Sequence, residues 1–295
     1  MKRPYGAMVV MATPFNASGS LDEKGYRANI DWYIASGIHG VICTGSTSEF
    51  ASLSRDELKK TIEVTVDQVA GRVPVMAGTA AVTTRDTLEM TRFAAKAGVD
   101  TALIVGPYYG GPNQEELALH FVTVAEGAGL PIMLYNNPGL SGVDLLPETV
   151  AAIAEQCDNV TFIKETSGDF KRVHEIQNLT RGTVEVWCGW EDLALEFLLM
   201  GAGGWVAPTA NFAPTLCARL FEQVRGGQLA EARKTYDTLL PLLQFLEEGR
   251  FLAKCKAALD LLGLAGGKPR LPFLPVDDEA RQRLAGLMRA AGLLG

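Results

Sequence analysis

Residues 159–168 read Asn159-Val160-Thr161-Phe162-Ile163-Lys164-Glu165-Thr166-Ser167-Gly168. The apolar part of this stretch is β-branched and aromatic, which is typical of a strand inside a parallel sheet. Thr166-Ser167-Gly168 supplies the turn that ends the strand. We therefore expect a buried strand with Lys164 at its carboxyl end.

Lys164 is a candidate nucleophile because of this position. Removing an ammonium from water favours its neutral form, and a neutral amine attacks a carbonyl carbon to form a Schiff base. The alternative is a structural lysine that reaches solvent at the strand edge, since most lysines are exposed. The other strand ends of the chain bear on this choice.

Short apolar runs like this one recur along the chain. There are eight: 7–12, 40–44, 73–78, 101–106, 131–135, 160–164, 184–189 and 204–207. Between them lie segments with helical periodicity, and Ser54 followed by Glu57 has the spacing of a capping box. This alternation predicts an α/β fold, a (β/α)8 TIM barrel, whose chemistry lies where the strands end. A doubly wound open sheet is the rival, but it usually carries a glycine-rich fingerprint after its first strand, and Ala12-Thr13-Pro14-Phe15 is not one.

After Arg225 the pattern becomes purely helical, through residues 229–248, 251–262 and 277–293. We divide the chain into a catalytic barrel over residues 1–225 and a C-terminal helical extension over residues 226–295. Because the extension contains no strand run, we expect it to serve packing and assembly rather than to form a second active domain.

Composition narrows the class of partner. The 295 residues are 47% hydrophobic and 21% charged, which is enough to bury a large core. A net charge of −7 disfavours nucleic acid and anionic membranes, so a small-molecule substrate is expected. The five cysteines are scattered without the spacing of a disulfide framework or a metal knuckle. No apolar segment has the length of a signal peptide or a membrane span, and we expect a cytoplasmic protein.

The three histidines are also dispersed, at His39, His120 and His174. Their spacing predicts neither a histidine metal cluster nor a Ser-His-Asp arrangement. We therefore expect metal-free chemistry.

The second run ends in Gly45-Ser46-Thr47-Ser48-Glu49, a small and hydroxyl-rich turn. Consecutive backbone N–H groups and two hydroxyls before a helix can hold a small carboxylate. The alternative is an ordinary turn with a helix cap. Glu49 is either a partner of these hydroxyls or a solvated residue at the helix start.

Tyrosines and carboxylates follow three other runs. Tyr109 follows the fourth run and Tyr135 ends the fifth, and a phenol can move a proton to and from a carbinolamine or an enamine. Most tyrosines at such rims only pack, so their coincidence with Lys164 is what favours catalysis. Glu191 and Asp192 follow Gly189 after the seventh run, where they either bind substrate hydroxyls or cap the next helix.

Together these motifs resemble the dihydrodipicolinate synthase and N-acetylneuraminate lyase family of pyruvate-dependent class I aldolases. The similarity spans essentially the whole chain. The motifs that carry it are Gly45-Ser46-Thr47-x-Glu49, Tyr108-Tyr109, Tyr135-Asn136-x-Pro138, Lys164-x-Thr166-x-Gly168 and Gly189, in the family's order and spacing.

The resemblance implies roles for the site residues. Lys164 would form the Schiff base with a 2-oxo acid, so no separate cofactor is needed, and Tyr135 would be the general acid/base. Tyr109 would enter the neighbouring subunit's site and complete a proton relay with Thr47 and Tyr135, which implies a homotetramer built from dimers. The residues that would bind substrate are Ser46, Thr47, Thr166, Gly189, Glu191 and Val206.

One departure from the family pattern affects the substrate. In the synthases proper an arginine follows the Tyr-Asn-x-Pro stretch and binds the carboxylate of aspartate semialdehyde, whereas here Leu140 stands at that place. A leucine cannot make a bidentate pair with a carboxylate.

We therefore predict a class I lyase or aldolase that acts on pyruvate or on a pyruvate-bearing 2-oxo acid through an imine on Lys164. The substrates considered are 2-keto-3-deoxy sugar acids, sialate and hydroxyproline-pathway intermediates. One alternative is dihydrodipicolinate synthase itself. A second, from another class, is a non-catalytic 2-oxo-acid-binding regulator on the same fold.

Overall fold

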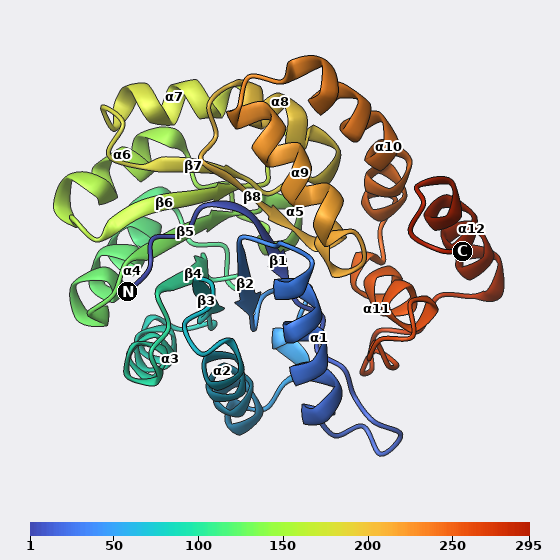
Figure 1. Cartoon of the computed structure of the whole chain (residues 1–295). Helices are drawn as coiled ribbons and strands as arrows, with labels where there is room; N and C mark the ends of the chain where they lie inside the picture. The colour runs from blue at the N-terminus through green and yellow to red at the C-terminus, as the bar shows by residue number, and fades with distance from the viewer.

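A closed barrel of eight parallel strands forms the centre of the computed structural model, which describes residues 1–295 (Figure 1). The strands are β1 Gly6–Val10, β2 Gly40–Cys43, β3 Val75–Gly78, β4 Thr101–Val105, β5 Ile132–Asn136, β6 Val160–Glu165, β7 Glu185–Cys188 and β8 Gly204–Ala207. Each strand pairs with the next and β8 pairs with β1, so the sheet has no open edge. The predicted (β/α)8 TIM barrel is confirmed, and each predicted run overlaps one strand.

Helices surround the barrel and follow its strands in sequence. They are α1 Glu23–Ala35, α2 Arg55–Val69, α3 Thr84–Ala97, α4 Gln114–Ala128, α5 Pro138–Ser141, α6 Pro147–Gln156, α7 Arg172–Leu179, α8 Ala194–Leu199 and α9 Pro214–Arg225. Three short 3-10 helices, η1 Phe50–Ser52, η2 Glu191–Leu193 and η3 Pro208–Asn211, follow β2, β7 and β8. The capping box predicted at Ser54 and Glu57 opens α2.

Alternation along each strand sorts its side chains between two apolar layers. Phe162 belongs to the cluster inside the barrel, whereas Ile163 belongs to the larger cluster between the strands and the helices. The period of two therefore sends Lys164 inward with Phe162, and Glu165 outward with Ile163. This is why neighbouring residues of one strand, Lys164 and Glu165, have different surroundings.

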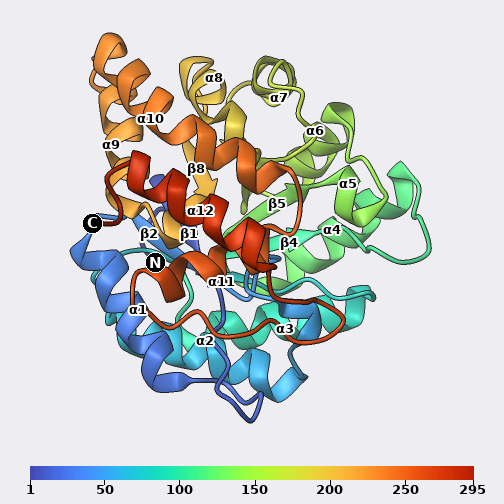
Figure 2. The ribbon, with the colours of Figure 1, turned by 90° about the vertical axis from the view of Figure 1, so that its right-hand side faces the viewer.

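The C-terminal extension consists of α10 Leu229–Glu247, α11 Phe251–Leu261 and α12 Asp278–Ala290. Figure 2 shows these three helices on the side of the barrel that faces the viewer. Helix α10 packs on α9 and η2, and α11 packs on η3. Side chains of the extension, among them Leu239, Leu243 and Phe245, belong to the same buried cluster as the barrel. None of the helices combines the length and the apolar character that crossing a bilayer requires.

Candidate active site

Lys164 and Tyr135 lie side by side at the carboxyl ends of β6 and β5. The two residues are register partners in the sheet, and the Lys164 Nζ atom lies 4.0 Å from the centre of the Tyr135 ring. Only 5% of Lys164 is exposed. The predicted nucleophile and the predicted acid/base are therefore in contact, and both side chains are buried.

The absence of a side chain at Gly189 leaves room for the Lys164 side chain. A Cβ atom at this position would lie 2.7 Å from Lys164 Cε and 2.0 Å from Thr166 Oγ1, closer than atoms can approach. The Thr166 hydroxyl is itself buried and has no hydrogen-bond partner within the protein. Gly189 and Thr166 thus lie beside the amine, with one hydroxyl available for a substrate.

Ser46 and Thr47 form the turn after β2 and line the same cavity as Lys164. Neither of their backbone N–H groups makes a hydrogen bond within the protein. Two adjacent free N–H groups beside two hydroxyls are a suitable cradle for a carboxylate group. This arrangement supports the carboxylate-binding alternative for the turn.

Several polar groups surround the Tyr135 phenol. Burial by itself would raise the pKa of the phenol, but the adjacent Lys164 ammonium lowers it, and the hydrogen bond from Asn137 acts in the same direction. The net effect is a pKa of Tyr135 below its usual value, which suits a group that exchanges protons with a substrate. Thr47, which the resemblance places in the relay, lines the same cavity as Tyr135, as does Ser46.

Two of the proposed residues lie away from the cavity. Tyr109 lies on the loop after β4 with 81% of its surface exposed, and Val206 is fully buried in the interior cluster of the barrel. Neither lines the cavity above Lys164. Within one subunit, therefore, Tyr109 does not reach Tyr135.

Glu191 lines the cavity but is already engaged by the protein. Its carboxylate accepts hydrogen bonds from the Thr209 backbone N–H at 3.1 Å and from the Thr209 hydroxyl at 2.7 Å. Burial raises the pKa of Glu191 to about 8, despite these donors. It is therefore a largely protonated carboxyl near neutral pH, which can donate as well as accept a hydrogen bond.

The cavity above Lys164 has a volume of about 370 Å³, and part of its wall comes from the C-terminal extension. Glu247, Arg250 and Phe251, from the junction of α10 and α11, line it opposite Leu140. The sequence predicted only packing and assembly for this extension. Its contribution to the site was missed because no local signal links residues about a hundred positions apart.

Glu49 takes neither role considered from the sequence. Its side chain is fully buried, pairs with the Lys256 ammonium at 2.5 Å, and accepts a hydrogen bond from the Arg270 backbone N–H at 2.9 Å. This buried pair ties the Ser46–Thr47 turn to helix α11 of the extension.

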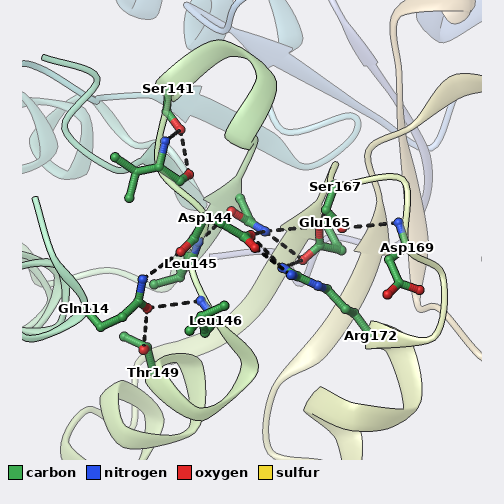
Figure 3. A network of polar contacts seen from close by, with 12 residues as sticks. Gln114, Ser141, Asp144, Leu145, Leu146, Thr149, Glu165, Ser167, Asp169 and Arg172 are labelled. Atoms are coloured by element: carbon green, nitrogen blue, oxygen red, sulfur yellow. Dashed lines mark hydrogen bonds and ion pairs between the residues drawn. The ribbon is translucent and has the colours of Figure 1, made fainter. Parts of the chain in front are cut away.

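A polar network supports β5 and β6 on the side away from the cavity (Figure 3). Arg172 makes two hydrogen bonds of 2.7 Å to Asp144 and lies 3.7 Å from the buried Glu165. Asn136 donates to both Asp144 and Glu165. Because Asn136 and Glu165 follow Tyr135 and Lys164 directly in sequence, this network holds the ends of the two strands that carry Tyr135 and Lys164.

The chain contains no cluster of three or more His, Cys, Asp or Glu side chains that could hold a metal ion.

Comparison with known proteins matches residues 3–291 to the model of the dihydrodipicolinate synthetase family. The 4-hydroxy-tetrahydrodipicolinate synthase of Bartonella bacilliformis is 37% identical over 289 residues, which cover 98% of each chain. The solved dihydrodipicolinate synthase of Acinetobacter baumannii, complexed with pyruvate, has a TM-score of 0.95 at 32% identity and covers 98% of this chain and 99% of that one. A monomeric dihydrodipicolinate synthase variant has a TM-score of 0.94 at 32% identity, with 98% of this chain and 97% of that one covered.

Proposed function

Because this chain belongs to the dihydrodipicolinate synthetase family, a family of Schiff-base-forming lyases, we propose that it forms an imine between Lys164 and pyruvate. The observation that carries this proposal is the contact between the buried Lys164 amine and the Tyr135 phenol, below a turn with two free N–H groups. No separate cofactor is required, because the lysine itself supplies the covalent chemistry.

The reaction follows from the positions of these groups. The Ser46–Thr47 turn holds the carboxylate of pyruvate. The Lys164 ammonium passes a proton to the adjacent Tyr135 phenolate, and the amine that results attacks the C2 carbonyl carbon. Tyr135 delivers a proton to the departing oxygen, so that water leaves and the imine remains. Loss of a methyl proton gives an enamine whose carbon attacks the carbonyl carbon of a second substrate. Hydrolysis of the product imine then frees Lys164.

The imine is tested directly by trapping. Pyruvate with borohydride should add the mass of a reduced pyruvyl group to the one peptide that contains Lys164, and Lys164→Ala should abolish the adduct. Tyr135→Phe should slow turnover by about 10²-fold or more, the usual contribution of an acid/base group. An adduct on another lysine, or none with pyruvate, would contradict the mechanism.

For the second substrate, aspartate semialdehyde is the first candidate, which makes the activity that of a 4-hydroxy-tetrahydrodipicolinate synthase. The sequence-based prediction placed this activity second. The relative from Bartonella bacilliformis, which is similar over nearly the whole chain, is named a 4-hydroxy-tetrahydrodipicolinate synthase, and this name supports the synthase activity better than cleavage of a hydroxylated 2-oxo acid.

One observation favours a second candidate, a lyase that acts on hydroxylated 2-oxo acids. Leu140 is 57% exposed at the cavity wall, where it offers no charge to a second carboxylate. Leaving such a carboxylate unpaired would lower the rate by about 10²-fold. Glu191, in contrast, offers a carboxyl that can pair with substrate hydroxyls.

Paired assays decide between these two candidates. A kcat/KM with pyruvate and aspartate semialdehyde of roughly 10⁴ M⁻¹s⁻¹ or above would establish the synthase. A much lower value, together with cleavage of a 2-keto-3-deoxy sugar acid, sialate or a hydroxyproline-pathway intermediate, would establish the lyase. In that case Leu140→Arg should raise the synthase rate and lower the lyase rate.

The same trapping experiment and substrate assays distinguish a non-catalytic binding protein from an enzyme. Such a protein would bind a 2-oxo acid, and could form the adduct, but would convert none of the substrates. The acid/base group beside Lys164 supports an enzyme, because binding alone needs no proton transfer.

We also propose a homotetramer built from dimers. An apolar cavity of about 280 Å³ adjoins Tyr135 and is lined by Phe50, Tyr108 and Phe273, and the exposed Tyr109 lies next to Tyr108 in sequence. Tyr109 of a second copy would complete the proton relay there. Light scattering should give four chains per particle, and Tyr109→Phe should lower turnover. A fully active monomer would contradict the role of Tyr109 in a neighbouring site.

A further inference from the structure

Asn137 contacts the Tyr135 phenol directly. It lies two residues after Tyr135, at the end of β5, with 8% of its surface exposed. Its Nδ2 atom lies 2.7 Å from the Tyr135 Oη atom, and its Oδ1 atom accepts a hydrogen bond of 3.1 Å from the Leu140 backbone N–H. One amide therefore caps helix α5 with its oxygen and meets the phenol with its nitrogen.

The cap fixes the orientation of this amide. An amide oxygen can only accept and an amide nitrogen can only donate, so an exchange of the two atoms would face the Leu140 N–H with another donor. The nitrogen must therefore face Tyr135, and the phenol oxygen must accept its hydrogen. Consequently the phenol cannot direct its own proton toward Asn137.

The other groups that face the phenol determine where that proton goes. Lys164, from β6, is the charged group in contact with Tyr135, and Ser46 and Thr47, from the turn after β2, line the same cavity. Glu49 and Tyr108 line the adjoining apolar cavity, and Glu49 is paired with Lys256. Since an amide nitrogen and an ammonium offer only donors, the phenol proton must leave toward the cavity lined by the Ser46 and Thr47 hydroxyls and not toward Asn137.

We propose that Asn137 is a positioning residue for the acid/base step: its capped amide holds the Tyr135 phenol so that its proton leaves toward the cavity, and it stabilises the phenolate that results. The proposal rests on the proposed imine chemistry for its catalytic meaning, but the hydrogen bond acts on Tyr135 whether or not a substrate is bound. Neither the pattern of the sequence nor the family resemblance predicted a role for Asn137.

Two substitutions keep the helix cap and change only the group at the phenol. Asn, Asp and Ser are all good N-caps, so Asn137→Asp and Asn137→Ser should both preserve α5. Aspartate presents an acceptor and a negative charge to the phenol in place of a donor, and serine removes the donor. The same substitutions at Asn113, which caps α4, are matched controls that do not touch Tyr135.

The first readout needs no substrate. Spectroscopic titration of the tyrosines, with Tyr135→Phe subtracted to isolate Tyr135, should show its pKa raised in Asn137→Ser and raised further in Asn137→Asp, because each change disfavours the phenolate. The Asn113 variants should titrate as the wild type. An unchanged Tyr135 titration in both Asn137 variants, at an unchanged Tm, would overturn the proposal.

The second readout is the rate of pyruvate trapping by borohydride as a function of pH. The limb of the profile that reports Tyr135 should move to higher pH in both Asn137 variants, with a rate at pH 7 reduced about tenfold. A rate that falls equally at every pH would assign Asn137 a purely structural role and overturn the proposal. Failure of the wild type to trap pyruvate would refute the imine chemistry alone, because the titration tests Asn137 without it.

Discussion

At the scale of single residues, the site depends on close approach as much as on chemical type. Lys164 can reach over Tyr135 because position 189 carries no side chain. The same closeness makes the residues of the site sensitive to changes of one or two atoms.

Gly189→Ala tests this closeness. The added methyl group would collide with Thr166 Oγ1 and Lys164 Cε, so the lysine must leave its place beside Tyr135. We expect pyruvate trapping to fall by more than tenfold. Gly286→Ala, on the exposed side of α12 where a Cβ atom meets nothing within 4 Å, should leave trapping unchanged. A trapping rate equal to that of the wild type in Gly189→Ala would show that Lys164 does not need the space that Gly189 leaves.

The raised pKa of Glu191 predicts that the free energy of unfolding depends on pH. Burial raises its pKa from an ordinary value of 4.5 to about 8, so the native state keeps a proton that the unfolded state has lost between these pH values. Stability from this group is therefore full below pH 4.5 and falls as the pH rises toward 8, by a few kcal/mol in total.

Glu191→Gln removes this titration while it keeps the shape of the side chain. Urea denaturation at pH 5 and pH 8 should show that the variant loses less stability between the two pH values than the wild type does. An equal loss in both proteins would mean that Glu191 is ionised in the native state across this range.

At the scale of elements, β5 and β6 are held by charges behind the sheet. Glu165 is fully buried, and burial raises its pKa although the hydrogen bonds at Ser167 and Asn136 and the charge of Arg172 lower it. The outward face of the strand that carries Lys164 thus holds a buried carboxylate, which the neighbouring hydrogen bonds and the charge of Arg172 stabilise.

Arg172→Met tests how far the buried Glu165 depends on the charge of Arg172. Methionine keeps much of the apolar contact of the arginine stem but leaves Glu165 and Asp144 without their cation, at a cost of about 3 kcal/mol in the free energy of unfolding at pH 8. Adding Glu165→Gln should recover part of the loss, since the buried charge is then gone. A cost below about 0.5 kcal/mol would show that the network contributes little to stability.

At the scale of the whole molecule, the extension and the barrel share one core and one site. Helix α10 contributes to the main buried cluster, Lys256 of α11 pairs with Glu49, and Arg250 lines the cavity. The boundary predicted after residue 225 coincides with the end of α9, but the contacts across it are extensive.

We therefore expect the two parts to be unable to fold separately. Calorimetry of the full chain should show a single cooperative transition, and a fragment of residues 1–225 should lack one, because it exposes the apolar surface that α10 covers. Two resolved transitions, or a fragment that melts cooperatively, would show that the barrel and the extension fold independently.

The sequence by itself determined the strands, their order and the residue at the end of each. Alternation with period two and the helical period are local signals, and the runs that carry them sit within two residues of the observed strands. Lys164, Tyr135, Gly189 and the Ser46–Thr47 turn could be named because strand ends gather at one face of a barrel.

Only the tertiary structure decided which groups touch. The bond from Asn137 to Tyr135, the pair of Glu49 with Lys256, and the wall that Arg250 adds to the cavity depend on distances between atoms. Glu49 and Lys256 are far apart in sequence, and Asn137 reaches the phenol only because Leu140 fixes its amide. Closure of the barrel and docking of the extension set these distances, and no local pattern of residue types records them.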